Sequence, residues 1–385
     1  MFPPKTANVW TVDELNAVLT GSYANVDACH RPDFGCRTDF EAPAGPELRP
    51  GVIVAKCHVK PFNNTATNNK FIFLREIGGR GCLVGFLESV IAEGTKSPHW
   101  GGTLIIDEEV PLECPIVIPA GFTLAGTGIN GAGRLRFSGD FFGIPAVRFQ
   151  DLNGGNSTIR DLAILGPGLS KPMGGIKIGT SALVSDNDPD PPGRFRFHRV
   201  LVRGFGTFGM QGGLNARYVT IDGCQLIQNG VNIQLIRKCD GWRIRDCIIA
   251  EARTWGVDIG ADIKEIFTGK SIFGSLSDVL ISGCLFIRNG EGAIQVQPGG
   301  FHPDRTFGVF IFGNGFVDNG GIALRLAHEN AGVRIVANFL GKDEQFDLPT
   351  DLMDSVEPRE THIGFNATKT DLPTQFVLNQ LRAPI

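Results

Sequence analysis

Two stretches of the sequence share one pattern and can be laid over one another: ARYVTIDGCQLIQNGVNIQL (216–235) and GWRIRDCIIAEARTWGVDIG (241–260). Each reads as a short strand, a polar or glycine corner, a second short strand, an Asn-Gly or Trp-Gly step and a third short strand. Related segments recur between residues 157 and 341. Three short strands per repeat with Gly or Asn at the corners are typical of a parallel β-helix, in which each repeat forms one coil.

The spacing of the corner residues supports this fold. The corner recurs at Asp161, Arg199, Gly223, Asp246, Gly283, Gly313 and Ala337. Neighbouring corners lie as little as 23 or 24 residues apart, so longer coils must carry insertions. The repeats show no 3.6-residue amphipathic spacing, which argues against a helical solenoid. The residue after the corner is Cys224, Cys247, Cys284, Asn314 and Asn338 in five successive coils, which predicts an inward stack of small side chains.

Composition excludes several classes of protein. Of 385 residues, 51 are Gly and 42% are hydrophobic, without a collagen-like period. The net charge of −4 gives no reason to expect nucleic acid as a partner, and no apolar run is long enough for a membrane span. The first residues lack a secretory signal. We therefore expect a secreted or surface-associated protein if a signal was removed, and a cytoplasmic one otherwise.

The cysteines divide into two groups. Cys224, Cys247 and Cys284 belong to the predicted core, whereas Cys29, Cys36, Cys57 and Cys82 fall near the N-terminus and Cys114 and Cys239 lack an obvious partner. A zinc cluster with the neighbouring histidines is disfavoured because no C-x2-C pair exists. We expect mostly reduced cysteines, with one N-terminal disulfide if the protein is exported.

The order of elements suggests three regions. Residues 1–100 are irregular and end in an amphipathic helix over Leu83–Glu93, residues 101–345 form a β-helix of about ten coils, and residues 346–385 form an extension or end cap. The helix, then GGTLII (101–106), then IPAGFTLAGTG (118–128), resembles the entrance to the pectate-lyase-like β-helix superfamily. That resemblance implies an all-β, right-handed parallel β-helix whose N-terminal end is capped by the helix.

Three long coils place their extra residues after the third strand. The insertions 180–193, 263–275 and 298–306 should therefore stack along one edge and form a wall, where function concentrates. Strand alternation predicts polar side chains on the outer face beside this wall. They are Lys177, Asn232, Gln234, Asp258, Gln295, Gln297, Arg325 and, from the loop edge, Asp262 and His328. This set suits a hydroxyl-rich ligand and contains no Trp or Tyr, although a solvated sheet face would also need polar residues.

Carboxylates near the middle of this set suggest glycoside chemistry. Cleavage needs an acid and a base or nucleophile about 5–9.5 Å apart, so Asp258 is the favoured catalytic residue, with Asp246, Glu251 or Asp262 as its partner. Asp246 stands at the corner position that Asp161 occupies in another coil, which favours turn capping over catalysis for this residue. The segment 241–260 also resembles the acidic segment of inulin fructotransferases. This resemblance implies catalytic roles for Asp246 and Asp258, although a Glu stands one position away in that family.

Other functions remain open. A uronate lyase or epimerase would use Lys177, Arg253, Arg325 or His328 as the base, with Ca²⁺ or Arg neutralising the substrate. Asp186, Asp188 and Asp190 form a spaced acidic run that could hold Ca²⁺, but they lack the rest of an EF-hand loop. A non-catalytic glycan-binding fibre or surface module, such as a homotrimer, is a further alternative, as is a structural passenger with no ligand. The expected partner is a carbohydrate, and no cofactor is required.

Overall fold

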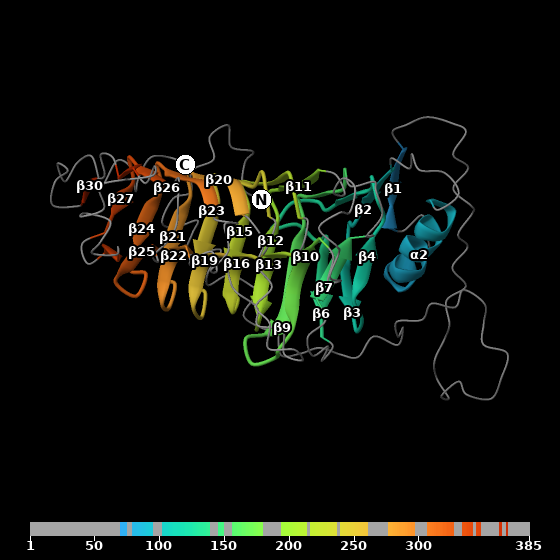
Figure 1. Cartoon of the computed structure of the whole chain (residues 1–385). Coiled ribbons are helices and arrows are strands. Elements are labelled where there is room, and N and C mark those ends of the chain that lie inside the picture. Colours follow the sequence, from blue (N-terminus) through green and yellow to red (C-terminus); the bar gives the residue numbers. More distant parts are fainter. Residues whose placement is uncertain are drawn as a thin grey trace, which may run out of the picture.

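The structure is a computed structural model of the chain. It describes residues 70–74, 79–94, 102–138, 145–149, 156–179, 194–213, 216–236, 239–260, 276–296, 306–326, 333–341, 344–347, 362–363 and 367–368. Nearly all of these residues lie in short parallel strands or in the corners between them, and the strands form three long sheets side by side (Figure 1).

We name the three sheets A, B and C in the order in which each coil visits them. Sheet A contains β1 (Lys70–Phe73), β2 (Gly102–Ile105), β5 (Thr123–Ala125), β8 (Thr158–Arg160), β11 (Phe195–His198), β14 (Val219–Asp222), β17 (Arg243–Arg245), β20 (Leu276–Ser282), β23 (Thr306–Phe312), β26 (Val333–Val336) and β29 (His362–Ile363). Sheet B contains β3 (Glu109–Leu112), β6 (Arg134–Phe137), β9 (Ala163–Gly168), β12 (Leu201–Phe205), β15 (Gln225–Ile227), β18 (Ile248–Ala250), β21 (Leu285–Ile287), β24 (Gly315–Val317), β27 (Phe339–Leu340) and β30 (Ala367–Thr368). Sheet C contains β4 (Ile116–Ile118), β7 (Pro145–Phe149), β10 (Gly174–Ile178), β13 (Phe208–Gly212), β16 (Val231–Leu235), β19 (Trp255–Ile259), β22 (Gly292–Val296), β25 (Ile322–Leu326) and β28 (Gln345–Asp347).

Each strand pairs in parallel with the strand one coil earlier and the strand one coil later. In sheet A, for example, Ile221 lies between Phe197 and Ile244. Sheet C, the shortest of the three, has nine strands among the described residues, so about nine coils are complete. The parallel β-helix expected from the repeats is confirmed, with slightly fewer coils than expected.

The core runs along the inside of the coils. The residues expected to face inward on the third strand are all buried: Ile176, Ile178, Ile233, Leu235, Ile259, Val296, Leu324 and Leu326. The predicted corner residues all adopt a left-handed backbone, with φ between 49° and 65°. Cys224, Cys247, Cys284, Asn314 and Asn338 are buried behind those corners, as predicted. Asn314 donates a hydrogen bond to the side chain of Asn338 over 3.0 Å.

A second ladder fills the corner between sheets B and C. Asn289 donates to Asn319 over 2.7 Å, and Asn319 donates to Glu344 over 2.9 Å. Asn229 occupies the same corner two coils before Asn289, and its amide donates to Asn232 over 2.8 Å. All of these side chains are buried. They hold adjacent coils together at a corner where aliphatic residues could not satisfy the backbone.

The ends of the β-helix differ from the expected boundaries. Helix α2 (Leu83–Gly94) lies beside the first coils, as expected (Figure 1), and buries Leu83, Phe86, Leu87 and Val90. Strand β1, however, already pairs with β2 ahead of this helix. Strands β29 and β30 continue sheets A and B beyond residue 345. Pairing with β1, β29 and β30 satisfies backbone groups of β2, β26 and β27 that would otherwise lie at a sheet edge.

Two further findings bear on the sequence analysis. Cys114 is disulfide-bonded, so it does have a partner. No helix among the described residues is long and apolar enough to cross a membrane. The N-terminal cysteines and histidines, except for the backbone of Cys82, lie outside the described residues.

Candidate functional site

The polar residues predicted on the third strand form one continuous column on the outer face of sheet C. Lys177 pairs with Gln211, Gln211 with Gln234, Gln234 with Asp258, Asp258 with Gln295, and Gln295 with Arg325. Arg148 precedes Lys177 and Asp347 follows Arg325 in the same register. Adjacent members are therefore about 4.8 Å apart along the helix axis. We call this set the sheet C column.

Asp258 lies near the middle of the column, with an amide side chain on each side. Its neighbours are Gln234 one coil earlier and Gln295 one coil later. Asp258 is only 6% exposed, whereas the two glutamines are half-buried. Gln211 donates a hydrogen bond to Gln234 over 2.8 Å, which orients the amide next to the carboxylate. The column thus places one shielded carboxylate between fixed hydrogen-bonding groups.

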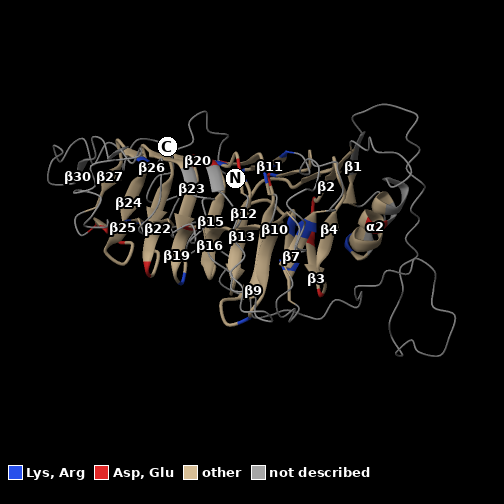
Figure 2. Cartoon of the chain, in the orientation of Figure 1, with Lys and Arg blue, Asp and Glu red and all other residues tan. Residues whose placement is uncertain are grey.

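Cations lie toward both ends of the column. Arg148 and Lys177 precede the glutamines, and Arg325 lies two coils beyond Asp258. Arg325 forms an ion pair with Asp347 over 2.7 Å, which offsets its charge. Figure 2 shows how sparse charged residues are along the strands of sheet C. The few charges present therefore dominate the field on this face.

Trp255 lies on the same outer face, which strand alternation did not predict. Gly256 and Val257 both face the interior, since a β-carbon on Gly256 would approach Asn289. This irregularity turns Trp255 outward, beside the column. The guanidinium carbon of Arg325 lies 5.0 Å from the centre of the indole ring, within cation–π range. The column therefore has an aromatic neighbour, although its members include no Trp or Tyr.

The expectation that Asn232 faces outward was wrong. Asn232 is fully buried, receives the hydrogen bond from Asn229, and donates to the carbonyl of Ala250 over 2.9 Å. The adjacent Ile233 is also buried, so two consecutive side chains face inward at the start of this strand. The Asn ladder at the corner accounts for this departure from alternation. Asn232 is a core residue and cannot bind a ligand on the outer face.

Asp246 and Glu251 do not lie beside Asp258. Asp246 occupies the left-handed corner between sheets A and B, on the opposite side of the coil from sheet C. Glu251 occupies the corner between sheets B and C and forms an ion pair with Arg288 over 2.8 Å. Trp255, which follows Glu251 in the sequence, is already about 10 Å from Asp258 along the strand. Since Glu251 lies further back still, neither carboxylate is placed to act together with Asp258.

Several predicted residues fall outside the described part of the chain. They are Asp262, Gln297 and His328 at the loop edge, Asp186, Asp188 and Asp190 in the first insertion, and nearly all of the three insertions themselves. In the part of the chain that the structure describes, no three His, Cys, Asp or Glu side chains gather as metal ligands. Arg253, a candidate base, donates to the carbonyl of Gly206 over 3.1 Å and precedes the strand that carries Asp258.

Three members of the column were missed by the sequence analysis. Gln211 belongs to the segment FGMQGG (208–213), whose glycines obscure the alternation, and Arg148 lies in a coil before the first clear repeat. Asp347 follows the last clear repeat. Extending the third-strand alignment by one coil at the front and one at the back, and including the coil between Lys177 and Gln234, would have found all three.

Comparisons with known proteins agree with the architecture. No family model matches the chain, and no curated protein matches it. Among solved structures, it is similar to tailspike protein gp49 of the Acinetobacter baumannii bacteriophage Fri1, a capsular polysaccharide depolymerase, with 13% identity and a TM-score of 0.52 over 79% of this chain and 63% of that one. This similarity fits the right-handed β-helix implied by the pectate-lyase-like resemblance.

Two other phage tailspikes match less closely. The Dettilon tailspike protein gp208 has 12% identity and a TM-score of 0.47 over 77% of this chain and 59% of that one. The enzymatically active domain of bacteriophage CBA120 tailspike protein 2 has 13% identity and a TM-score of 0.47 over 79% of this chain and 47% of that one. The chain thus spans less than two thirds of the length of these solved structures.

Proposed function

We propose that this protein is a carbohydrate-active enzyme that binds a polysaccharide along the sheet C column and cleaves or rearranges it with Asp258 as the catalytic carboxylate. The observation that carries the proposal is the register of the column. One shielded carboxylate lies between Gln234 and Gln295, at the regular spacing of the coils. A chain of sugars laid along the helix axis would meet one polar side chain about every 4.8 Å.

The chemistry of the column suits such a ligand. Amide side chains both donate and accept hydrogen bonds, as sugar hydroxyls do. A carboxylate shielded from water can transfer a proton to or from a glycosidic oxygen, or attack the anomeric carbon. Asp262, four residues beyond Asp258, remains the proposed partner and lies outside the described residues. The polysaccharide depolymerase activity of the Fri1 tailspike, which has the same fold, supports a polysaccharide as the substrate class.

β-Elimination on an acidic polysaccharide is the second candidate. Arg148, Lys177 and Arg325 lie in the same column as Asp258, and the guanidinium groups of Arg148 and Arg325 could neutralise a uronate carboxylate. Lys177, in its neutral form, would abstract the proton next to that carboxylate, a carbon–carbon double bond would form, and the bond to the leaving sugar oxygen would break. The fructotransferase-type reaction depends on Asp246 as well as Asp258, and the distance between their positions argues against it.

Replacing Asp258 with Asn tests the proposal. The substitution keeps the shape of the side chain and removes its charge, so turnover of an oligosaccharide or polysaccharide found in a substrate panel should fall at least ~100-fold. Asp318→Asn is the matched control, because Asp318 is an exposed corner residue outside the column and Asn also tolerates its left-handed backbone. Full activity of the Asp258→Asn variant would remove Asp258 from the mechanism.

The products distinguish the remaining alternatives. Only elimination leaves an unsaturated uronate, which absorbs ultraviolet light, and Lys177→Ala should then abolish its formation. Binding without any product would indicate a glycan-binding module. The expected homotrimer stays a prediction, and light scattering of the purified protein would test it.

A further inference from the structure

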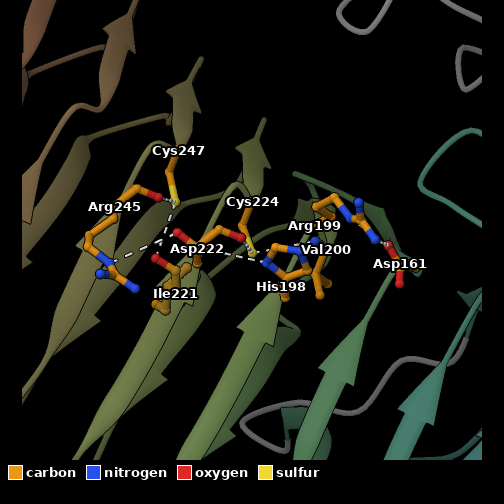
Figure 3. A network of polar contacts seen from close by, with 9 residues as sticks. All are labelled: Asp161, His198, Arg199, Val200, Ile221, Asp222, Cys224, Arg245 and Cys247. Carbon is orange, nitrogen blue, oxygen red and sulfur yellow. Dashed lines mark hydrogen bonds and ion pairs between the residues drawn. The ribbon is translucent and has the colours of Figure 1, made fainter. Parts of the chain in front are cut away.

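A second cluster of charged side chains lies on sheet A, away from the sheet C column. Arg160, His198, Asp222 and Arg245 are neighbours in register, one per coil, at the ends of β8, β11, β14 and β17. The corner that follows carries Asp161 and Arg199. Figure 3 shows all of these residues except Arg160, along the edge where sheet A turns into sheet B. We call Arg160, His198, Arg199 and Arg245 the cationic edge.

Each carboxylate in this cluster is shared by two basic side chains. Asp161 accepts from Arg160 over 3.0 Å and from Arg199 over 2.6 Å. Asp222 contacts Nδ1 of His198 over 3.0 Å, and a nitrogen of Arg245 lies 3.9 Å away. Four basic groups therefore face two carboxylates. With His198 neutral, the four arginines Arg160, Arg199, Arg245 and, in the neighbouring column, Arg196 exceed the three carboxylates Asp161, Asp222 and Asp246 by one charge, in a chain whose net charge is −4.

Exposure differs between the two kinds of side chain. The side chains of Asp161 and Asp222 are 13% and 24% exposed, whereas those of the cationic edge are 38% to 54% exposed. The acids lie beneath and hold the basic groups in place, and the basic groups face the solvent. Because Nδ1 of His198 is engaged by Asp222, Nε2 is the ring nitrogen left for a ligand, and it can donate to a carboxylate only when the ring carries both protons.

The backbone beneath this cluster is fixed by the cysteine stack. The thiol of Cys224 donates to the carbonyl of Asp222 over 3.5 Å, and that of Cys247 donates to the carbonyl of Arg245 over 3.0 Å. The aliphatic stem of Arg199 packs over Gly223, whose added β-carbon would lie 3.6 Å from Cγ of Arg199. Basic groups on a rigid support lose little entropy on binding, which favours a preformed anion site.

The positive character continues along sheet A. Arg196 is exposed and lies between Thr158 and Thr220 in the neighbouring column, and among the described residues its side chain forms no ion pair. Its neighbours supply hydroxyl groups next to a guanidinium. A ligand that carries both carboxylates and hydroxyls would match this arrangement, because a guanidinium binds a carboxylate through two parallel hydrogen bonds.

We propose that the cationic edge is a second, non-catalytic binding site for the carboxylates of an acidic polysaccharide. The choice of a polysaccharide rests on the proposed function, whereas the choice of an acidic ligand rests on the cluster itself. A nucleic acid is disfavoured because the chain as a whole is negatively charged. Holding the polymer at sheet A would raise its effective concentration at the sheet C column.

The test is affinity electrophoresis of the whole protein in gels that contain polygalacturonate, with dextran as the neutral polymer. The wild-type protein should be slowed by polygalacturonate and not by dextran. The double variant Arg199→Gln/Arg245→Gln should lose most of this retardation, at least about fivefold in apparent dissociation constant. Arg334→Gln on the same sheet is the matched control, because it is exposed and lies three coils beyond Arg245 in the adjacent column.

The double variant should fold, because Asp161 retains its ion pair with Arg160 and Asp222 retains its contact with His198. An unchanged circular dichroism spectrum would verify this. If it does not fold, the single variants Arg199→Gln and Arg245→Gln replace it, and each should weaken retardation. Equal retardation of wild type and variants, equal loss in Arg334→Gln, or no retardation of wild type would each overturn the proposal. Turnover of the Asp258→Asn variant reports on the catalytic proposal, whereas retardation of the Arg199→Gln/Arg245→Gln variant reports on the cationic edge, so the failure of one proposal is distinguishable from the failure of the other.

Discussion

The indole ring of Trp255 lies directly over Gly292, its neighbour on the next coil, so closely that a β-carbon at Gly292 would overlap the ring. The ring extends onward to Arg325, one coil further. Glycine at 292 therefore permits the only described tryptophan–arginine contact on the outer face of sheet C. The pair links the packing of this face to the position of a cation in the column.

Gly292→Ala should displace the indole ring and separate it from Arg325. We expect a loss of about 1–3 kcal/mol in the free energy of unfolding, since overpacking forces side chains out of their preferred positions. Urea denaturation and the emission spectrum of the tryptophans would measure both effects. Gly315→Ala is the control, because its β-carbon would meet only the mobile end of Leu285 at 3.1 Å. Equal losses in the two variants would contradict this account of Gly292.

The cysteine stack should be unreactive in the folded protein. Burial raises the pKa of Cys224 and of Cys247 well above the ordinary range, so little thiolate is present at pH 8. Peptide mapping after treatment with iodoacetamide should find both residues unlabelled in the native protein and labelled in denaturant. Rapid labelling of either cysteine in the native protein would show that it does not face the core.

The fold could be predicted from the sequence because the residues that repeat are those at the corners and on the inside of each coil. Left-handed corners favour Gly or Asp, and the position behind them is Cys or Asn in five successive coils, so Gly223 and Cys224 mark the register directly. The same register predicted that Lys177, Gln234, Asp258, Gln295 and Arg325 share one column.

The site was harder to predict because alternation fails at the start of the third strand. There, the ladder through Asn229 and Asn289 draws Asn232 inward and turns Trp255 outward. A pattern of polar and apolar residues cannot distinguish a buried amide in a ladder from an exposed one. The separation of the carboxylates around the coil could not be predicted either. Asp246, Glu251 and Asp258 are close in sequence but lie at two different corners and on a sheet face.

The ladder itself gives a stability prediction. Asn289 accepts a hydrogen bond from the backbone N–H of Ala252 over 3.0 Å and donates to the carbonyl of Ile249 over 3.1 Å. Asn289→Ala leaves both backbone groups buried and unpaired, which should cost about 2–4 kcal/mol. Thr207→Ala, at an exposed position nearby, should cost less than about 0.5 kcal/mol. Thermal or urea unfolding would compare them, and a loss below 1 kcal/mol for Asn289→Ala would contradict the role of the ladder.

Glu109 should make stability depend on pH near the first coils. The hydrogen bond from Arg136, together with the charges of Arg136 and Arg134, lowers the pKa of Glu109 in the folded protein. A lowered pKa stabilises the fold above the unfolded-state pKa, and this contribution is lost as the pH falls through the folded-state pKa. The melting temperature of wild type should therefore exceed that of Glu109→Gln at pH 7, and the gap should close toward pH 3. The free energies of unfolding of wild type and Glu109→Gln should differ by no more than about 1 kcal/mol, because Glu109 is partly exposed. A gap independent of pH would exclude this effect.

Glu251 provides a comparison that separates backbone strain from side-chain contacts. It adopts a left-handed backbone with φ 53°, forms an ion pair with Arg288, and accepts a hydrogen bond from Gln228 over 2.8 Å. Glu251→Ala and Glu251→Gly both lose these contacts, so both should be less stable than wild type. Only glycine relieves the left-handed strain, which exceeds its extra cost in chain entropy. The Gly variant should therefore be more stable than the Ala variant by about 0.5–1 kcal/mol. Urea unfolding of the three proteins would measure this order. An Ala variant that is more stable than the Gly variant would mean that the corner backbone differs from the one described, and with it the separation of Glu251 from Asp258.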